Sequence, residues 1–268
     1  MDKIIGFIGC GNMAQAIMGS IIKAKLVPTE NIIASDVIPS LREMVSEKHN
    51  IRTTMDNKEV VRAADYVILA IKPNVYELVL NEIKDYIKEN GIILSIGAGI
   101  SSSFLKKNLN EGTKYVKVMP NTPALVGEGM SAVAMTDMFS KEEFNEILSI
   151  LNTFGRTEVI PEYQMDGFTA ISGSSPAYVF MMIEAMADGA VLEGIPRVQA
   201  YTIAAQAVLG SAKMVLETGL HPAALKDNVC SPAGTTIDAV ASLEENGFRS
   251  AIIEAIRVCA DKSREMSK

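Results

Sequence analysis

The feature that most constrains the fold is a glycine-rich segment between an apolar run and a helical pattern near the start of the chain. Residues 3–14 read KIIGFIGCGNMA, so Gly9, Gly11 and Ala14 form the pattern G-x-G-x-x-A directly after a short strand. In a Rossmann βαβ unit the first position permits a tight turn, the second lets the backbone approach a pyrophosphate, and the third allows close helix–strand packing. This context predicts a dinucleotide site with its phosphates at the helix N-terminus; a glycine turn without a ligand is the alternative.

The pattern of strands and helices divides the chain near residue 160. Up to that point short β-branched runs alternate with helical patterns, which is typical of βαβ units and a parallel sheet. Beyond Pro161 the strand signal ends, and Ala, Met, Leu and Ile recur at helical spacing. We predict an α/β fold: an N-terminal Rossmann doubly wound parallel sheet over residues 1–160, followed by an all-helical C-terminal dimerisation domain over residues 161–268. The expected strands are residues 3–8, 31–35, 66–71, 92–96 and 115–118, with two later candidates at residues 131–135 and 157–160.

The helices of the second domain are too apolar to remain exposed on a monomer. The first begins at residues 174–176 (SSP), where a serine cap precedes a proline in the first turn. Residues 179–192 carry Glu184 and Asp188 as their charged side chains, and residues 198–216 are almost as apolar. A helix that is apolar nearly all round must be buried. We predict a homodimer held together by these helices, open to assembly into a higher homo-oligomer; one Ala-rich monomeric bundle is the alternative.

Charge and the scarcity of cysteine and histidine narrow the function classes. The chain has 25 Lys and Arg against 32 Asp and Glu, a net charge of −7, so no excess of positive charge indicates a nucleic-acid partner. Cys10, Cys230 and Cys259 are far apart without C-x-x-C spacing, and the histidines are His49 and His221. A disulfide framework and a metal site are therefore not expected. The sequence shows neither a secretory pattern nor an uninterrupted membrane-length apolar run, so we expect a cytoplasmic protein without a membrane partner.

An acidic residue after the second expected strand bears on the identity of the dinucleotide. Residues 33–36 read IASD, which places Ser35 and Asp36 where the adenosine ribose lies in Rossmann domains. A carboxylate there accepts hydrogen bonds from a 2′-hydroxyl and repels a 2′-phosphate, so Asp36 favours NADH. The alternative is that Asp36 caps the following turn with Pro39, and Arg42 is near enough in sequence to reach a phosphate.

Three further loops follow expected strands and should lie at the same ligand-binding edge of the sheet. Residues 67–73 (VILAIKP) and 92–99 (IILSIGAG) both run from a strand into small or chain-breaking residues, and residues 118–123 (VMPNTP) form a stiff polar loop. Lys72 either contacts the diphosphate or is an ordinary solvated lysine, and Pro73 fixes the turn. From these loops we expect cofactor contacts by Ala70, Ile71, Lys72, Pro73, Gly97, Ala98 and Asn121, the last beside the nicotinamide.

The most informative part of the helical half is the segment of residues 226–238, KDNVCSPAGTTID. Small residues and hydroxyl groups lead into an apolar-periodic helix, so backbone N–H groups and hydroxyls meet at one helix start. Such a place suits a small carboxylate. The alternative is an ordinary capping box, because Thr235 is followed three residues later by Asp238. Spacing alone leaves both interpretations open.

Taken together, five motifs resemble those of the pyrroline-5-carboxylate reductase family. They are residues 6–14, 70–73, 119–123, 172–178 and 225–236, in the order that the family has them, and residues 247–249 (GFR) follow near the end. The resemblance covers essentially the whole chain. It implies an N-terminal Rossmann domain, a C-terminal helical dimerisation domain, and reduction of the cyclic imine Δ1-pyrroline-5-carboxylate to L-proline with NADPH or NADH, the last step of proline biosynthesis.

The resemblance also implies roles for individual residues. Those that match cofactor contacts of the family are Ile8, Gly9, Cys10, Gly11, Asn12, Met13, Asn57, Ala70, Ile71, Lys72, Pro73 and Asn228. Those that match substrate contacts are Glu162, Thr235 and Thr236, with Ser231 and Gly234 on the same loop. The sequence departs from the family at Asp36, where relatives often carry a small polar residue, and at Ser175 and Ala233, where many have glycine. Cofactor preference is therefore open, while both turns are expected to survive.

These inferences lead to a mechanistic hypothesis and two alternatives. A hydride passes directly from the reduced nicotinamide to the C=N carbon, N–H groups of residues 231–236 hold the substrate carboxylate, and positioning does most of the work. We expect the Thr236 hydroxyl to act as the catalytic group by hydrogen-bonding the imine nitrogen. A β-hydroxyacid dehydrogenase-like reductase would instead use Lys213 or Lys226 as its acid. A non-enzymatic dinucleotide sensor would bind the cofactor without turnover.

Overall fold

The computed structural model describes residues 1–134 and 136–266, and compactness divides the chain into two units. Unit 1 comprises residues 1–173 together with the end of the chain from Cys259, and unit 2 comprises residues 174–258. This division falls after Gly173, whereas the predicted boundary between a dinucleotide domain and a helical domain lies at residue 160. That boundary remains a prediction.

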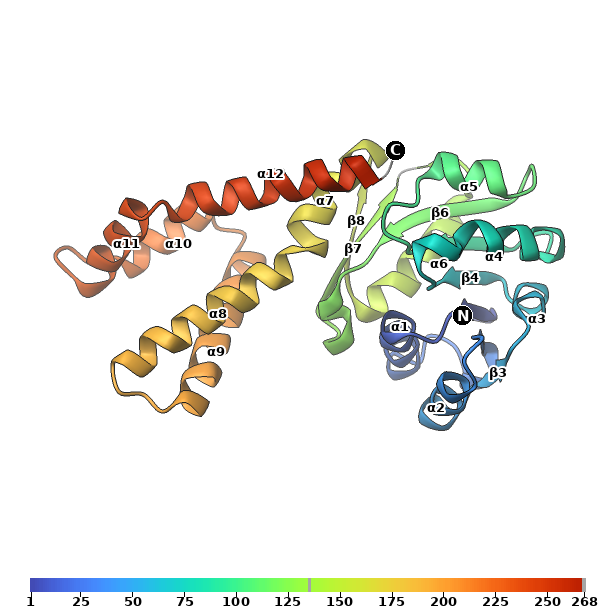
Figure 1. Cartoon of the computed structure of the whole chain (residues 1–268), viewed down its shortest axis with the longest axis horizontal. Helices are drawn as coiled ribbons and strands as arrows, with labels where there is room; N and C mark the ends of the chain where they lie inside the picture. The colour runs from blue at the N-terminus through green and yellow to red at the C-terminus, as the bar shows by residue number, and fades with distance from the viewer. Residues whose placement is uncertain (135, 267–268) are drawn as a thin grey trace. The chain divides into compact units, whose positions relative to one another are not determined.

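Unit 1 is built on an eight-stranded sheet with the strand order β3-β2-β1-β4-β5-β6-β7-β8 (Figure 1). The strands are β1 (Ile5–Ile8), β2 (Ile32–Ser35), β3 (Arg52–Thr54), β4 (Tyr66–Leu69), β5 (Ile92–Ser95), β6 (Lys114–Met119), β7 (Gly129–Ala134) and β8 (Gly155–Ile160). The order runs outward from β1 in both directions, so the carboxyl ends of β1 and β4 flank the point at which the topology reverses. The predicted doubly wound Rossmann arrangement is confirmed.

Apolar side chains cover both faces of the central strands, which explains their uninterrupted apolar runs. The helices of unit 1 are α1 (Asn12–Lys23), α2 (Pro39–His49), α3 (Asn57–Ala63), α4 (Tyr76–Ile83), α5 (Ser102–Asn108), α6 (Lys141–Leu151) and α7 (Met165–Phe168). On one face Phe7 and Ile68 belong to a core with residues of α1, α2 and α6. On the other face Ile8 and Val67 belong to a core with residues of α3, α4 and α5.

The pairing of β6 with β7 departs from the predicted parallel sheet. These strands are antiparallel, with Val118 opposite Val133 and Met119 opposite Ala132. Residues 120–128 connect them, and so short a connection cannot make the crossover that a parallel pair requires. The pairing returns to parallel between β7 and β8, because α6 lies between these strands in the chain.

The predicted strands agree with the observed ones to within a few residues, and one strand was not predicted. β4 ends at Leu69, so Ala70 and Ile71 belong to the loop that follows it. The sequence pattern misses β3 because its residues, RTT, are polar and it is a short edge strand. Met135, the last residue of one predicted strand, lies outside the described residues.

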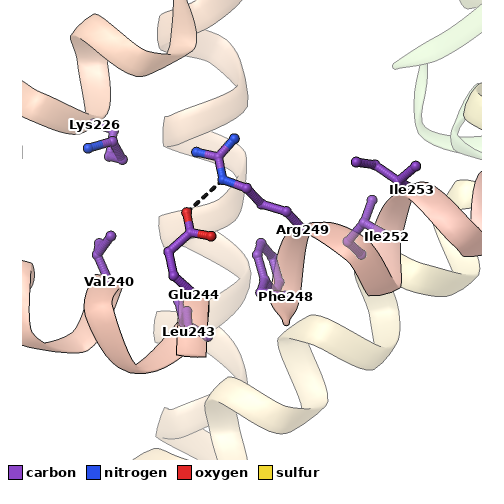
Figure 2. Close-up of a pocket in the computed structure, with 8 residues that line it drawn as sticks. All are labelled: Lys226, Val240, Leu243, Glu244, Phe248, Arg249, Ile252 and Ile253. Carbon is purple, nitrogen blue, oxygen red and sulfur yellow. Dashed lines mark hydrogen bonds and ion pairs between the residues drawn. The ribbon is translucent and has the colours of Figure 1, made fainter. Parts of the chain in front are cut away.

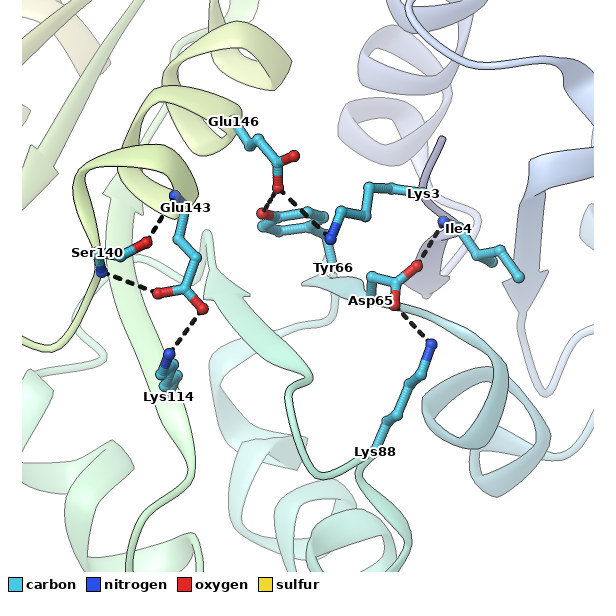
Figure 3. A network of polar contacts seen from close by, with 9 residues as sticks. All are labelled: Lys3, Ile4, Asp65, Tyr66, Lys88, Lys114, Ser140, Glu143 and Glu146. Atoms are coloured by element: carbon cyan, nitrogen blue, oxygen red, sulfur yellow. Dashed lines mark hydrogen bonds and ion pairs between the residues drawn. The ribbon is translucent and has the colours of Figure 1, made fainter. Parts of the chain in front are cut away.

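Ion pairs and hydrogen bonds tie the amino ends of the strands in unit 1 to neighbouring segments (Figure 3). Asp65, directly before β4, accepts hydrogen bonds from Ile4 N at 2.9 Å and from Lys88 Nζ at 2.6 Å. Burial alone would raise the pKa of Asp65, but these two bonds and the nearby lysine charges lower it overall. At β6, Lys114 Nζ donates to Glu143 Oε1 of α6 at 2.6 Å. These contacts stabilise the edge of the sheet opposite the carboxyl ends of the strands.

Within its described residues, unit 2 consists of helices joined by short connections. It contains α8 (Ser175–Leu192), α9 (Arg197–Thr218), α10 (Pro222–Val229), α11 (Thr235–Glu245) and the first part of α12 (Phe248–Met266). α8 and α9 pack against each other, yet within the described residues of these two helices the buried side chains are Ala187, Ala200 and Ala204. Phe180 is 63% exposed and Met181 is 68% exposed. One chain therefore leaves uncovered the apolar helix surface that the sequence predicts to be buried between subunits.

The same unit has an apolar hollow between the end of α11 and the start of α12 (Figure 2). Its volume is about 550 Å³, and Val240, Phe248 and Ile252 contribute to its lining. Arg249 Nε donates to Glu244 Oε1 at 2.6 Å at its rim. Hollows lined by exposed apolar side chains are typical of surfaces that another protein chain covers.

Candidate functional site

The glycine-rich segment forms a turn between β1 and α1 at the carboxyl edge of the sheet. Gly9 has a φ of +100°, and a Cβ on it would lie 2.4 Å from the carbonyl oxygen of Ala70. Its N–H donates to the carbonyl oxygen of Ser35 at 2.7 Å, which holds the turn against the end of β2. A residue with a side chain cannot combine this positive φ with so close an approach. The shape of the turn therefore depends on Gly9.

The start of α1 is open and uncapped. Gly11 is its N-cap in an extended conformation, and no side chain in the described part of the protein caps the helix. A Cβ on Gly11 would meet no described atom within 4 Å beyond its chain neighbours, whereas Ala14 is fully buried. Packing therefore explains the small residue at Ala14, while close approach of a ligand to the backbone explains Gly11. The open space and the free N–H groups of the first turn fit a pyrophosphate.

The strand register places Asp36 beside the glycine turn. Ile8 pairs with Ser35 in the parallel β1–β2 ladder, so the residues after both strands emerge together. The Asp36 carboxylate accepts two backbone hydrogen bonds, from Cys10 N at 2.8 Å and from Ile38 N at 2.9 Å. The second bond is the turn cap that was the alternative interpretation of Asp36. The first joins the carboxylate to the glycine turn, and both leave acceptor sites on the two oxygens for a ribose hydroxyl.

Two opposite charges lie next to Cys10. Burial, and then the Asp36 carboxylate, raise the pKa of the Cys10 thiol to about 12, while the Arg42 guanidinium acts in the opposite direction. The thiol is therefore neutral at physiological pH. Arg42 Nη1 donates to the main-chain carbonyl oxygen of Asp36 at 2.6 Å. The cation that the sequence offered for a phosphate is thus engaged with the backbone at Asp36.

Ser35 and Asn57 form a buried hydrogen-bond chain behind Asp36. Ser35 Oγ donates to Asn57 Oδ1 at 2.7 Å, and Asn57 Nδ2 donates to Glu82 Oε2 at 3.0 Å. The chain of bonds links the end of β2, the first residue of α3 and the last turn of α4. These hydrogen bonds give Ser35 and Asn57 a positioning role at this edge of the sheet. The contact of these two residues with a dinucleotide remains a prediction.

The loops after β4 and β5 line a pocket of about 610 Å³ in unit 1. Pro73 and Ala98, both predicted to contact the cofactor, belong to its lining, and the exposed Lys72 directly precedes Pro73. Ala70 N donates to the carbonyl oxygen of Ile8 at 2.9 Å, so the loop after β4 lies against the glycine turn. The structure thus brings the glycine turn and the loop after β4 together, and joins that loop to the one after β5 through the pocket.

A buried tyrosine that the sequence analysis missed supports the loop after β5. Tyr76 of α4 donates to the carbonyl oxygen of Leu69 at 2.8 Å and accepts from Ser95 Oγ at 3.3 Å. A Cβ on Gly97 would lie 2.7 Å from the tyrosine ring. Burial raises the pKa of Tyr76 to about 12, so its hydroxyl remains a donor. The small residue at Gly97 was the available sequence signal, and packing against Tyr76 accounts for it.

Asn121 and Glu162 both have structural partners within unit 1. The buried Asn121 donates through Nδ2 to the carbonyl oxygen of Ser172 at 3.1 Å, and its Oδ1 accepts from Met130 N at 2.8 Å. Glu162 Oε1 accepts from Ser102 N at 2.8 Å, at the start of α5. Asn121 therefore joins the loop after β6 to β7 and to the helical segment of residues 169–173, and Glu162 accepts from the first N–H group of α5. Their predicted places beside the nicotinamide and the substrate remain predictions.

A small polar cavity of about 180 Å³ lies next to Glu162. Tyr115, Lys117 and Thr136 contribute to its lining, and Lys117 is 8% exposed. Burial, and then the charge of Glu162, raise the pKa of Tyr115. The sequence gives no sign of this cavity, because its residues come from separate segments that only the tertiary fold brings together.

In unit 2 the predicted substrate loop forms a tight turn before α11. The N–H of Gly234 donates to the carbonyl oxygen of Ser231 at 3.0 Å, and a Cβ on Gly234 would lie 2.4 Å from Ser231 Oγ. Ala233 adopts a φ of +56°, so the turn forms with alanine in a conformation that glycine adopts more easily. Thr235 is exposed and Thr236 half-buried at the first two positions of the helix.

The capping box that was the alternative for Thr235 is wrong. Gly234 is the N-cap of α11, and no side chain of the described residues caps this helix. A capping box requires the side chain at the N-cap to accept from the third helical residue, and Thr235 lies one position too late for that role. The N–H groups of the first turn are therefore available to an anion. Asn228 is exposed in the last turn of α10, on the segment that leads into this loop.

The lysines of the alternative reductase lie in surface ion pairs. Lys213 Nζ is 3.5 Å from Glu217 Oε1, and Lys226 Nζ is 2.5 Å from Asp227 Oδ1. The hydrogen bond to Asp227 raises the pKa of Lys226, which makes this ammonium a weaker acid. Lys226 is thus poorly suited to proton donation.

No group of three or more His, Cys, Asp or Glu side chains in the described residues could hold a metal ion. Residues 1–134 and 136–266 also contain no helix with the length and apolar character needed to cross a membrane.

The doubly wound sheet, the fixed glycine turn and the uncapped start of α1 define the class: a Rossmann-type dinucleotide-binding protein. Residues 162–266 match a family described as pyrroline-5-carboxylate reductase dimerisation, and residues 4–99 match one described as NADP oxidoreductase, coenzyme F420-dependent. The chain is 48% identical over 268 residues to pyrroline-5-carboxylate reductase of Escherichia coli (strain K12), with 100% of both chains covered. It belongs to the pyrroline-5-carboxylate reductase family, as its motifs predict.

Two further relatives extend this similarity to another sequence and to a solved structure. Pyrroline-5-carboxylate reductase of Methanosarcina acetivorans is 47% identical over 267 residues, covering 100% of this chain and 99% of the relative. The crystal structure of Plasmodium falciparum pyrroline carboxylate reductase with NADP bound has a TM-score of 0.89 and 32% identity, covering 100% of this chain and 99% of that one. The similarity therefore includes both the sheet and the helical half.

Proposed function

We propose that this chain reduces Δ1-pyrroline-5-carboxylate to L-proline with NADH or NADPH as the hydride source. The family membership supports the reaction class. The observation that carries the choice of substrate is the uncapped first turn of α11, which follows a turn of small residues closed by the Gly234–Ser231 hydrogen bond. Converging backbone N–H groups and hydroxyls of this kind suit a small carboxylate, and the proposed substrate carries one.

The chain's part in dinucleotide binding follows from the carboxyl edge of the sheet. The open start of α1 and the glycine turn bind the pyrophosphate, and the end of β2 meets the adenosine ribose. When bound, the reduced nicotinamide supplies the hydride. The proposed cofactor contacts are Ile8, Gly9, Cys10, Gly11, Asn12, Met13, Ser35, Asp36, Asn57, Ala70, Ile71, Lys72, Pro73, Gly97, Ala98, Asn121 and Asn228.

On the substrate side the chain binds and orients the imino acid. N–H groups of residues 231–236 hold the carboxylate, and the Thr236 hydroxyl donates a hydrogen bond to the imine nitrogen. The C=N carbon gains the hydride, and the nitrogen takes up a proton from water relayed through the Thr236 hydroxyl, so the product is a cyclic secondary amine. The proposed substrate contacts are Glu162, Ser231, Gly234, Thr235 and Thr236.

The reaction is tested by following oxidation of NADH and of NADPH with pyrroline-5-carboxylate, and by detecting L-proline as the product. In Thr236→Ala we expect turnover at saturating substrate to fall on the order of 100-fold, because the hydrogen bond to the imine nitrogen is lost. Thr236→Ser keeps the hydroxyl and should retain most of the turnover. Thr29→Ala, in a turn before β2 at the opposite edge of the sheet, is the matched control.

Two outcomes would contradict the proposal at different levels. If neither dinucleotide is oxidised in the presence of the imine, the proposed reaction is wrong. If the reaction proceeds but Thr236→Ala turns over like Thr29→Ala, the reaction stands and Thr236 is not its catalytic residue.

Assembly and domain roles complete the proposal. The helical half forms a homodimer, supported by the match of residues 162–266 to a dimerisation family and by the exposed apolar faces of α8 and α9. We assign dinucleotide binding to residues 1–160 and dimerisation with substrate binding to residues 161–268. A cytoplasmic location is supported by three cysteines without paired spacing, which suit a reducing compartment.

A further inference from the structure

We propose that Asp36 makes this chain an NADH-preferring enzyme, because its carboxylate is placed to accept a hydrogen bond from the 2′-hydroxyl of the adenosine ribose. The inference rests on the proposed function, since it concerns the dinucleotide of the same site. It goes further by selecting one of the two cofactors. The 2′-phosphate is the group by which NADPH differs from NADH, so the residues around that position determine which of the two binds more tightly.

The carboxylate of Asp36 is fixed on the glycine turn. Asp36 N donates to the carbonyl oxygen of Thr54 at 3.3 Å, which anchors its main chain between β2 and β3. Its side chain accepts from Cys10 N at 2.8 Å and from Ile38 N at 2.9 Å. A carboxylate held by two backbone donors cannot turn away from a 2′-phosphate without breaking those bonds. Two negative groups would then share one place, which is strongly unfavourable.

The turn after Asp36 offers no side-chain donor to a phosphate. Val37 is 81% exposed and Ile38 is 48% exposed, and Pro39 follows as the first residue of α2. The N–H of Ile38, which could have met an anion, donates to the Asp36 carboxylate. Rossmann domains that accept the 2′-phosphate place an arginine near this position, whereas those that bind the 2′-hydroxyl place an acidic residue there.

The Arg42 guanidinium does not compensate for Asp36. Arg42 Nη1 donates to the main-chain carbonyl oxygen of Asp36 at 2.6 Å, so this guanidinium would have to leave that bond to reach a phosphate. The two charges can be compared at Cys10, which lies beside both. There the Asp36 carboxylate raises the pKa of the thiol by more than Arg42 lowers it. Beside Cys10 the effect of the carboxylate therefore exceeds that of the guanidinium.

Dissociation constants of NADH and NADPH for the cofactor-free full-length protein test the proposal without any turnover. Cofactor fluorescence reports both constants. We expect NADH to bind at least about tenfold more tightly than NADPH, as a like-charge contact requires. Adenosine 5′-phosphate and adenosine 2′,5′-bisphosphate, compared by calorimetry, isolate the 2′-phosphate and should show the same order. Equal or stronger binding of NADPH and of the bisphosphate would overturn the proposal.

Substitutions test whether the preference for NADH over NADPH depends on the carboxylate of Asp36. Asp36→Asn keeps an oxygen that accepts from Cys10 N but removes the charge, so it should tighten NADPH binding and reduce the preference to a few-fold. Asp36→Ser should do the same, and melting curves show whether each variant is folded. Asp2→Ser removes an exposed carboxylate at the amino end of the sheet and should leave the preference unchanged. An unchanged preference in a folded Asp36→Asn protein would also overturn the proposal.

The two proposals fail separately. If NADPH binds more tightly and still reduces pyrroline-5-carboxylate, the proposed function stands and the role of Asp36 is wrong. If NADH binds more tightly but no imine is reduced, the role of Asp36 stands and the proposed reaction is wrong.

Discussion

Gly9 and Gly11 belong to one motif but are required for different physical reasons. At Gly9 the backbone has a φ of +100° and a Cβ would collide with the carbonyl oxygen of Ala70 at 2.4 Å. At Gly11 the conformation is extended and the surrounding space is open among the described atoms. The first glycine thus serves the fold, and the second serves the ligand.

This difference predicts that one substitution lowers the stability of the protein and the other weakens its cofactor binding. Gly9→Ala should lower the free energy of unfolding by about 1–3 kcal/mol, because a strained backbone and a main-chain collision coincide. Gly11→Ala should change it by less than about 0.5 kcal/mol, as an open surface position allows. Its methyl group should instead weaken NADH binding on the order of tenfold by blocking the approach to the pyrophosphate. Denaturant unfolding and cofactor titration measure the two effects.

The reverse pattern would contradict this assignment. If Gly11→Ala destabilises the protein as much as Gly9→Ala does, then the glycine is required by packing and not by the ligand. If Gly11→Ala binds NADH as the wild type does, the pyrophosphate does not approach the backbone at this residue.

At the scale of the element, a single glutamate at the start of α6 both caps this helix and attaches it to the sheet. Ser140 accepts from Glu143 N at 3.2 Å, and Glu143 Oε2 accepts from Ser140 N at 2.9 Å, so the pair forms a capping box. The same carboxylate accepts from Lys114 Nζ on β6 at 2.6 Å (Figure 3). One side chain therefore caps the helix and attaches it to a strand.

Glu143 should make the stability of the protein depend on acid pH. The hydrogen bond from Lys114 chiefly lowers the pKa of Glu143, so the folded state favours the charged carboxylate. This contribution is complete above the unfolded pKa of about 4.3 and is lost as pH falls through the lower folded pKa. At pH 7 we expect Glu143→Gln to lower the free energy of unfolding by about 1 kcal/mol.

Denaturant unfolding at several pH values measures this difference, which should shrink as the solution becomes more acidic than the unfolded pKa. Glu142→Gln is the matched control, because Glu142 is exposed in the same first turn and should affect stability by only a few tenths of a kcal/mol through the helix dipole. A Glu143→Gln effect that stays constant down to acid pH would contradict the role of its charge.

The sequence alone predicts some of these elements and misses others. The central strands and the glycine turn were predictable, because apolar runs and glycine spacing are local signals. The edge strand β3 and the antiparallel direction of β7 were not, since both depend on pairing between distant segments. Asp36 and Thr235 were identified as candidates from the sequence. Only the hydrogen bonds around them could decide whether each residue caps a turn or helix or is available to a ligand.

At the scale of the whole molecule, the two units differ in what they bury. Unit 1 has a core on each face of its sheet, with Phe7, Ile68 and Val67 fully buried. In unit 2 the long helices expose large apolar side chains such as Phe180 and Met181. Burial of such surface is the main favourable term in association. The fold of one chain thus predicts that unit 2 is covered by a partner.

A charged residue on this surface should separate the subunits. We expect the wild-type protein to sediment as a dimer or a higher oligomer, and Met181→Glu to raise the dimer dissociation constant by roughly 100-fold or more, because an unpaired carboxylate would be buried. Leu78→Glu is the control, since Leu78 is 73% exposed on α4 of unit 1. Analytical ultracentrifugation over a range of concentrations measures the change. A monomeric wild type, or equal shifts in both variants, would contradict the proposed interface.

A single chain buries few side chains in unit 2. Within the described residues of this unit, the buried side chains are Ala187, Ala200 and Ala204. Two subunits joined through such helices form one shared hydrophobic core, so a subunit that dissociates exposes the apolar side chains of that core to water. Exchange of subunits between finished dimers should therefore be as slow as unfolding itself. Dimers that combine two different variants would form when both chains are synthesised or refolded together, and not when the purified proteins are mixed.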